Sequence, residues 1–452
     1  MQEFDLVVIG AGPGGYETAL AAAGNMRVAL VEKDALGGTC LNRGCIPTKS
    51  LLHTAELLQA FRQSGIFGIE HGEAACDFSA LHARKDQVIQ QLRDGIALRM
   101  KQKKVTVFQG IGTILNKNTV QIRRAEEITL KTNRILIATG SQPALPPISG
   151  IHSRHVETSD TLLNKTDVIY PRLVIIGGGV IGVEFASIFA ALGSTVTIVE
   201  ALPRLLGNMD KEISQSLKML FKKRGIEVLC DTKVQEIQEE GEGLRCICTQ
   251  GEKSLSIDSD GILVCVGRRP YTDGLFTDGF QVKQERGRIL VDEHFETSAP
   301  GVYAIGDVTG GMMLAHAATA QGKCALAHML EKKSPVSLIV PACVYTDPEI
   351  AAVGLTLEEA KEKGIQADSR KYPMSANGKS LLSQQERGFI KVVYEKESHR
   401  LLGANLMCAR ASDIISEMTQ ALVRGGTLEE LASVIRPHPT FSEGITEAVT
   451  LN

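Results

Sequence analysis

Two cysteines that lie five residues apart, Cys40 and Cys45, are the residues of this chain best suited to chemistry. A close pair of thiols can exchange electrons with a redox cofactor or with a disulfide substrate. In a regular helix such residues are about 8 to 9 Å apart at Cα, whereas a disulfide needs about 4.4 to 6.8 Å. Gly44 and Pro47 can distort the turn enough for the pair to bond. We therefore predict a redox-active pair; the alternative is two unrelated small core residues.

The segment after the second cysteine is predicted to form a helix from about Pro47 to Ala60. A thiolate at Cys45 would lie near the positive end of that helix, which lowers the pKa of a thiol. Lys49 lies one helical turn beyond Cys45 and could point toward the same cofactor. The alternative for Lys49 is an ordinary surface charge.

Two carboxylates and a histidine elsewhere in the chain are further candidates. Glu184 opens a second predicted helix, just past Gly182, and could pair with Lys49. His438 stands between two prolines, with Glu443 five residues later. A carboxylate that holds one imidazole nitrogen leaves the other as a proton acceptor near neutral pH. The alternatives are a surface charge for Glu184 and a buried structural role for His438.

The redox pair follows the pattern of a dinucleotide-binding fold. Strands are predicted at residues 4–9 and 28–31, with a helix at 16–24 between them. Gly10, Gly12 and Gly15 occupy the GxGxxG positions, and Glu32 ends the second strand 22 residues after Gly10. The first glycine permits a tight turn, the second lets a pyrophosphate approach the backbone, and the third lets the helix pack closely on the strand. The acid can bind a ribose hydroxyl. All five parts in order predict a dinucleotide site; a chance glycine turn is the alternative.

The same pattern recurs about 167 residues later. Strands are predicted at 172–176 and 195–199, with a helix at 183–192. The second fingerprint contains Gly177, Gly179, Val180 and Gly182, and Glu200 ends its second strand. Glu200 should bind a free ribose 2′-hydroxyl and repel a 2′-phosphate, which favours NAD over NADP. Arg204 is the one basic residue close by, and a basic side chain there would favour the 2′-phosphate of NADP.

The rest of the chain suggests a third domain of a different class. Further strands are expected at 135–140, 261–267 and 302–307, and a helix at 314–330. Beyond about residue 340 the pattern predicts antiparallel strands at 344–353, 388–393 and 401–407 and helices at 412–424 and 428–434. The predicted fold class is α/β, with two Rossmann-like dinucleotide-binding domains and a C-terminal α+β dimerisation domain. The predicted boundaries are 1–148 with 275–338, 149–274, and 339–452.

Composition excludes several other classes of protein. The 452 residues carry a net charge of −3 without a basic block, so we expect no nucleic-acid or membrane partner. No apolar run approaches the roughly 18 residues of a membrane span, and no secretory leader is recognisable. Ten cysteines in this length are not a disulfide scaffold. We expect a reducing cytoplasmic location and no metal site.

Taken together, these motifs resemble the FAD-dependent pyridine nucleotide–disulfide oxidoreductases, and most closely the members that oxidise dihydrolipoyl groups. The resemblance covers the whole chain and is carried by residues 37–49, 177–184, 302–308 and 438–443. It implies a tightly bound FAD in the first fold. The implied FAD contacts are Gly10, Gly12, Gly15, Glu32, Lys49, Gly140, Asp307, Leu314 and Ala315. The implied NAD contacts are Gly177, Gly179, Val180, Gly182, Glu184, Glu200 and Gly267.

The resemblance also implies catalytic roles and partners. Cys45 would contact the flavin and Cys40 would exchange with the substrate. His438, oriented by Glu443, would be the acid–base and would come from the other subunit of a homodimer built through the third domain, with a cis peptide before Pro439. The lipoyl group would arrive on a lipoyl-carrier protein or an E2 subunit of a 2-oxoacid dehydrogenase or glycine cleavage complex.

Two alternatives stay open. The protein could act on another small disulfide, or it could serve mainly as a docking subunit of such a complex. Glutathione-type reductases use NADPH, which Glu200 and Gly182 disfavour. Replacement of Cys45 or His438 separates an enzyme, which loses turnover, from a docking protein, which keeps its assembly.

Overall fold

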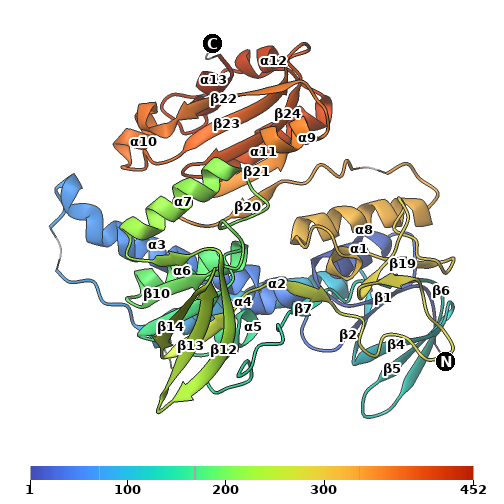
Figure 1. Cartoon of the computed structure of the whole chain (residues 1–452). Coiled ribbons are helices and arrows are strands. Elements are labelled where there is room, and N and C mark those ends of the chain that lie inside the picture. The colour runs from blue at the N-terminus through green and yellow to red at the C-terminus, as the bar shows by residue number, and fades with distance from the viewer. Residues whose placement is uncertain (1, 71, 167–168, 335, 451–452) are drawn as a thin grey trace.

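Three large sheets with their helices, and three smaller sheets of two or three strands, make up the described part of the chain (Figure 1). The structure is a computed structural model that describes residues 2–70, 72–166, 169–334 and 336–450. Two of the sheets are built on parallel strands and the C-terminal one is antiparallel. This arrangement confirms the predicted fold class. The domain boundaries remain predictions.

The first sheet contains seven strands in the order β3-β2-β1-β6-β5-β4, with β19 also paired to β6. Its strands are β1 (Gln2–Ile9), β2 (Val28–Glu32), β3 (Thr106–Gln109), β4 (Ile111–Asn116), β5 (Thr119–Arg123), β6 (Ile128–Ile137) and β19 (Val302–Ala304). The helices beside it are α1 (Pro13–Ala22), α2 (Gly38–Arg43), α3 (Cys45–Gln63), α4 (Phe78–Gln102) and α8 (Ala315–Met329). The second half of β1, residues 6–9, is buried and continuously apolar, as is typical of a parallel strand covered on both faces.

The second sheet is fully parallel, in the order β11-β10-β9-β15-β8. Its strands are β8 (Val156–Thr158), β9 (Arg172–Ile176), β10 (Thr195–Val199), β11 (Glu227–Leu229) and β15 (Gly261–Val264). Its helices are α5 (Ser159–Leu162), α6 (Val180–Ala191) and α7 (Lys211–Lys223). A separate antiparallel sheet beside it contains β12 (Thr232–Glu240), β13 (Gly243–Gln250) and β14 (Lys253–Ser259).

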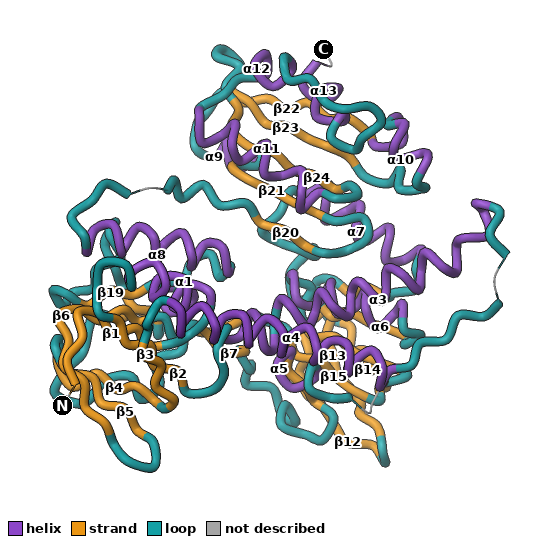
Figure 2. The backbone as a smooth tube through the Cα atoms, turned by 180° about the vertical axis from the view of Figure 1, so that it is seen from behind, coloured by secondary structure: helices purple, strands orange, loops and turns teal. Residues whose placement is uncertain are grey.

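The C-terminal sheet has the order β20-β21-β24-β23-β22 and lies over α3 and the second nucleotide fold (Figures 1 and 2). Its strands are β20 (Ala342–Val344), β21 (Ile350–Gly354), β22 (Ala367–Pro373), β23 (Phe389–Glu395) and β24 (Leu401–Met407). Its helices are α9 (Leu357–Glu362), α10 (Gly378–Leu382), α11 (Ala411–Arg424), α12 (Leu428–Ala432) and α13 (Glu443–Thr450).

Short paired strands mark the two crossings between the nucleotide folds. The chain leaves the first fold through β7 (Ser141–Pro143) and returns through β16 (Arg268–Pro270), and these strands pair antiparallel. A two-residue hairpin, β17 (Gln284–Glu285) with β18 (Arg288–Ile289), follows the return. Both crossings therefore run side by side.

Most predicted elements are confirmed, and the exceptions have physical reasons. The predicted strand at 344–353 is wrong: β20 and β21 are separate strands, because Pro348 lacks the N–H that a continuing strand needs. The strands expected at 135–140, 261–267 and 302–307 end three residues early, each before a glycine with positive φ. The elements that were not predicted include helices α4, α7 and α13 and strands β3, β4, β5, β12, β14 and β22. Among the described residues, no helix is long and apolar enough to cross a membrane.

Candidate active site

One cavity of about 2280 Å³ lies between the two nucleotide folds and the C-terminal sheet. It is lined by these predicted site residues: Gly10, Gly12, Gly15, Glu32, Cys40, Cys45, Lys49, Gly140, Gly177, Gly179, Val180, Glu184, Glu200, Gly267, Asp307, Leu314 and Ala315. Gly182, His438 and Glu443 are not among its lining residues. The structure thus brings together residues that span most of the chain.

The redox pair lies at a break between two helices. Helix α2 ends at Arg43, Gly44 has a non-helical backbone (φ −143°, ψ −112°), and α3 begins at Cys45. This is the distortion that the sequence predicts. Both cysteines are free thiols in this structure.

The two thiols differ in acidity. The thiol of Cys40 donates a hydrogen bond to Cys45, and this bond is the main cause that lowers the pKa of Cys45, to about 7. Lys49 lowers that pKa further, whereas burial and Glu184 oppose the shift. The pKa of Cys40 is raised, chiefly by the same hydrogen bond. The pair therefore favours a thiolate at Cys45 and a protonated thiol at Cys40.

Glu184 connects three parts of the molecule. Its Oε2 accepts a hydrogen bond from Lys49 Nζ at 2.7 Å, and its Oε1 accepts one from the backbone N–H of Tyr345 at 3.0 Å. Lys49 Nζ also lies 4.5 Å from the centroid of the Tyr345 ring. The predicted Lys49–Glu184 pair is present, and Tyr345 is a neighbour that the sequence did not indicate.

The two glycine turns have the space that dinucleotides require. A Cβ on Gly10 would lie 2.3 Å from the carbonyl oxygen of Ala138, and a Cβ on Gly15 would lie 2.0 Å from that of Gly10. A Cβ on Gly12, in contrast, would have no heavy atom within 4 Å. The outer glycines are thus required by the fold, while the middle one borders open space where a pyrophosphate fits.

The second turn repeats this geometry. A Cβ on Gly177 would lie 2.6 Å from the Cys265 carbonyl oxygen, and one on Gly182 would lie 2.0 Å from that of Gly177. Gly179 again borders open space. Gly182 therefore serves helix packing and does not face the cavity. Both turns fit the cofactors that the sequence implies.

The acids that end the two second strands have equivalent surroundings. Glu32 accepts hydrogen bonds from the backbone N–H groups of Ala11 and Asp34, at 2.7 and 2.8 Å. Glu200 accepts them from Gly178 and Leu202, at 2.5 and 2.7 Å. Each carboxylate is buried and also holds its own glycine turn, a function that the sequence did not indicate. Each oxygen retains a second lone pair for a ribose hydroxyl.

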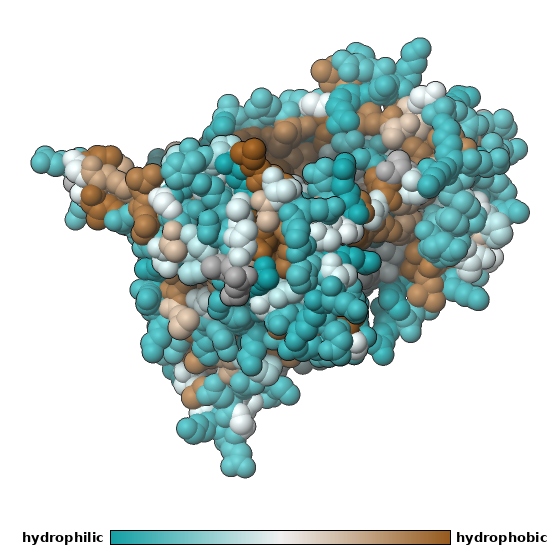
Figure 3. All heavy atoms as spheres, turned by 90° about the horizontal axis from the view of Figure 1, so that it is seen from above, coloured by the Kyte–Doolittle hydropathy of each residue, from teal (hydrophilic) through white to brown (hydrophobic). Residues whose placement is uncertain are grey.

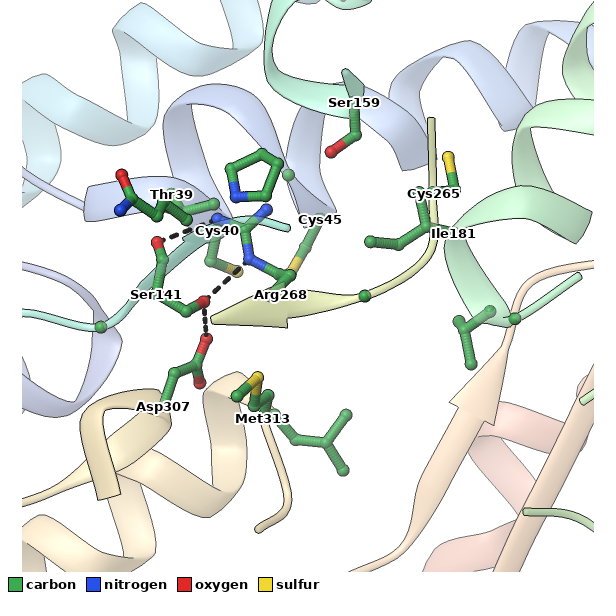
Figure 4. Close-up of a pocket in the computed structure, with 18 of the residues that line it drawn as sticks. Thr39, Cys40, Cys45, Ser141, Ser159, Ile181, Cys265, Arg268, Asp307 and Met313 are labelled. Atoms are coloured by element: carbon green, nitrogen blue, oxygen red, sulfur yellow. Dashed lines mark hydrogen bonds between the residues drawn. The ribbon is translucent and has the colours of Figure 1, made fainter. Parts of the chain in front are cut away.

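Asp307 is held by the outgoing crossing strand β7, which the return strand β16 supports in turn. Ser141 Oγ donates to Asp307 Oδ2 at 2.6 Å, and Arg268 Nε donates to Ser141 Oγ at 2.8 Å (Figure 4). The N-terminus of α8, with Leu314 as its N-cap and Ala315 as its first residue, borders the same cavity. The helix start agrees with the sequence prediction within one residue. Ser141 and Arg268 were missed, although Arg268 directly follows the glycine that ends the second fold.

His438 and Glu443 form the predicted pair. Nδ1 of His438 lies 2.8 Å from Glu443 Oε1, and the backbone N–H of Thr440 donates to Glu443 Oε2 at 2.7 Å. These two hydrogen bonds, that of Thr440 first, lower the pKa of the Glu443 carboxyl. The His438 side chain is 81% exposed, which excludes the buried structural alternative within one chain. The peptide before Pro439 is cis, as the resemblance implies.

Comparison with known proteins gives matches over nearly the whole chain. Residues 4–322 match the family model "Pyridine nucleotide-disulphide oxidoreductase", and residues 340–449 match the dimerisation domain of that family. Proteins named dihydrolipoyl dehydrogenase from Thermus scotoductus and Chlamydia pneumoniae are 39% and 37% identical. The matches cover 99% and 100% of this chain, respectively, and 97% of each relative.

Two solved structures are similar over their full length. LpdA from Mycobacterium tuberculosis has 26% identity and a TM-score of 0.91, with 99% of each chain covered. The Cu(II) complex of the HOCl-induced flavoprotein disulfide reductase RclA from Escherichia coli has 29% identity and a TM-score of 0.87. That match covers 100% of this chain and 99% of the other. The matched dimerisation domain supports a homodimer.

Proposed function

The chain belongs to the pyridine nucleotide-disulphide oxidoreductase family, and on that premise we propose that it is a dihydrolipoyl dehydrogenase. It would oxidise protein-bound dihydrolipoyl groups and pass hydride to NAD⁺. The observation that carries this proposal is the thiol pair at the start of α3, with an acidified Cys45, in the cavity that both glycine turns share. The names of the full-length relatives support the choice of substrate.

The first fold would hold FAD and the second would receive NAD⁺. Bound FAD would supply the group that takes two electrons from the thiol pair and delivers them to the nicotinamide. Gly12 leaves room for the FAD pyrophosphate, and Glu32 offers a ribose acceptor. Gly179 and Glu200 offer the same to NAD⁺.

The residues of the chain would carry the thiol chemistry. With the pair oxidised, Nε2 of His438 takes the proton of a substrate thiol, because Glu443 holds Nδ1. The resulting thiolate attacks Cys40 Sγ, the Cys40–Cys45 bond breaks, and Cys45 leaves as the thiolate that α3 and Lys49 stabilise. His438 then passes its proton to Cys40 as Cys40 leaves, and it takes up the proton of the second substrate thiol, whose sulfur closes the substrate disulfide.

His438 would reach Cys40 across a subunit interface. It does not line the cavity of its own chain. The C-terminal domain that carries His438 also exposes large apolar side chains: Ile435 is 96% exposed and Leu382 is 65% exposed. Another group protrudes at the end of α3, at the left of Figure 3, and includes Phe61 and Phe67. Such surfaces fit the contact between two copies of the chain.

We infer NAD in preference to NADP from Glu200. Its buried carboxylate would oppose a 2′-phosphate, and Arg204 is engaged with the carbonyl of Gly207 at 2.9 Å. Replacing Glu200 by Ala, with an Arg added nearby, should raise the rate with NADP⁺. An unchanged ratio of NAD⁺ to NADP⁺ rates would contradict this role.

A second candidate is reduction of another small disulfide. The likeness to RclA, a flavoprotein disulfide reductase, favours it. The deciding experiment compares dihydrolipoamide with NAD⁺ against glutathione disulfide with NADPH, while the flavin absorbance is recorded. We expect turnover only in the first pair. Turnover only in the second pair, or in neither, would reject the proposed substrate. If the protein were mainly a docking subunit, Cys45→Ser would leave the assembly of its complex intact.

A further inference from the structure

A series of alternating charges crosses from the redox pair to the second nucleotide fold. Arg43 Nη2 lies 2.5 Å from Asp34, and Arg43 Nε lies 3.8 Å from Asp160 Oδ2. The other oxygen of Asp160 lies 3.2 Å from Arg268 Nη1. Arg268 continues through Ser141 to Asp307, and all six of these residues line the cavity. Asp160 is thus the single carboxylate between two guanidinium groups in this series.

The members of this series belong to different parts of the fold. Asp160 is carried by the second fold, because α5 directly follows β8, the edge strand of the second sheet. Arg43 is the last residue of α2 and stands between the two cysteines in the sequence. Arg268 begins the return strand β16 and binds both the hydroxyl and the carbonyl of Ser141. Asp160 therefore joins the second fold both to the return strand β16 and to the redox hairpin, by which we mean α2 and the start of α3, where the two cysteines lie.

Charge and burial make this contact more than a surface pair. The side chains of Arg268, Asp160 and Arg43 are 13%, 21% and 33% exposed. Without the carboxylate, two guanidinium groups would face each other in a partly desolvated wall, where repulsion is stronger than in water. Figure 4 shows Arg268 beside the redox pair and directed to Ser141 and Asp307.

Other contacts attach the second fold through α6. Lys49 binds Glu184, and Arg62 Nη1 donates to the carbonyl of Ala191 at 2.8 Å. Both partners on this side lie on α3. Lys85 of α4 also donates to the carbonyl of Leu163, at the end of α5, at 2.8 Å. Asp160 adds the contact that joins the start of α5 to Arg43 and to the return strand.

We propose that Asp160 is a positioning residue that fixes the nicotinamide-binding fold against the redox hairpin by holding Arg43 and Arg268. This inference rests on the proposed function only for the use of FAD and a reduced nicotinamide. The geometry of hydride transfer depends on the placement of the second fold, and a misplacement of 1 Å can cost about a hundredfold in rate. Electron transfer from the thiol pair to FAD would take place within the first fold, so it should not depend on where the second fold lies.

The test separates the two half-reactions of the holoenzyme by stopped-flow flavin absorbance. In Asp160→Asn, we expect reduction of FAD by NADH to slow by about tenfold, which is less than the roughly hundredfold loss that a misplacement of 1 Å can cause. Reduction by dihydrolipoamide should change less than about twofold. Asp160→Glu keeps the charge and should restore most of the NADH rate. Asp258→Asn, which removes an exposed partner of Arg245, is the matched control and should alter neither rate.

A second measurement does not depend on activity. Amide hydrogen exchange in β7 and β16 should accelerate in Asp160→Asn and return toward the wild-type rate in Asp160→Glu. Equal slowing of both half-reactions, or an unchanged NADH rate, would overturn the proposal. If dihydrolipoamide fails to reduce even the wild-type protein, the proposed substrate is wrong, while the NADH arm still tests Asp160.

Discussion

Lys49 Nζ lies 2.7 Å from Glu184 Oε2, although the two residues are 135 positions apart in the chain. The pair joins the first turn of α3 to the first turns of α6, at the point where both nucleotide folds meet the redox pair. The ammonium group lowers the pKa of Cys45, whereas the carboxylate raises it. The two charges of one ion pair thus act on the same thiol in opposite directions.

Substitution of the two charges should therefore move the Cys45 titration in opposite directions. In the reduced protein, the thiolate of Cys45 forms as the pH rises through about 7. Lys49→Met should move this transition to higher pH, and Glu184→Gln should move it to lower pH. The pH dependence of alkylation at Cys45, followed by peptide mass spectrometry, measures both. Lys49→Arg is the control, and a shift of the same sign in both variants would contradict the assignment.

The hydrogen bond from Cys40 should account for most of the acidity of Cys45, because it is the largest cause of the lowered pKa. Cys40→Ser keeps a donor and should leave the alkylation profile of Cys45 close to that of the wild type. Cys40→Ala removes the donor and should move the thiolate transition to higher pH. Both variants should lose disulfide turnover. Identical alkylation profiles for Ser and Ala would show that the hydrogen bond is unimportant.

His438 should matter only for the thiol half of the reaction. His438→Ala should reduce dihydrolipoamide turnover by about 10²- to 10⁴-fold, the usual contribution of a general base. Glu443→Gln should cause a smaller loss, because the amide still occupies the position beside Nδ1. Electron transfer from NADH to an artificial acceptor should stay unchanged in both variants. A parallel loss of that activity would show that the loop has a structural role.

The proposed interface makes mixed dimers informative. Cys40→Ser and His438→Ala chains should each be inactive, yet a dimer of one with the other contains one complete site. Co-expression with two different affinity tags should yield heterodimers with about half of the wild-type turnover, since one site of two is intact. Heterodimers as inactive as the parents would place His438 and Cys40 within one subunit.

Gly12 and Gly15 of the first turn should respond differently to alanine. Gly12→Ala should fold with normal thermal stability but bind FAD more weakly, because its Cβ would enter only the open space. Gly15→Ala should lower the thermal stability of the FAD-free protein, since its Cβ would lie 2.0 Å from the Gly10 carbonyl oxygen. Thermal unfolding with and without FAD measures both effects. Equal destabilisation of both FAD-free variants would contradict the assignment of Gly12 to the cofactor.

The sequence by itself determined the features that depend on neighbours in the chain. The two glycine turns, each with its strands and terminal acid, were predicted because one turn contains all of the backbone constraints that it must satisfy. The break between Cys40 and Cys45 was predictable for the same reason, since Gly44 and Pro47 act locally. The pair of His438 and Glu443 also spans only five residues.

Only the tertiary structure decided which charges meet across the folds. Nothing in the local sequence distinguishes Asp160 from other acids at a helix start, or relates Arg268 to Ser141 across 127 positions. Tyr345 beside Lys49 follows from the placement of β20 over the cavity. Local sequence encodes backbone conformation and burial through short-range sterics and periodicity. Contacts between domains instead depend on how complete sheets pack, and every intervening residue contributes to that packing.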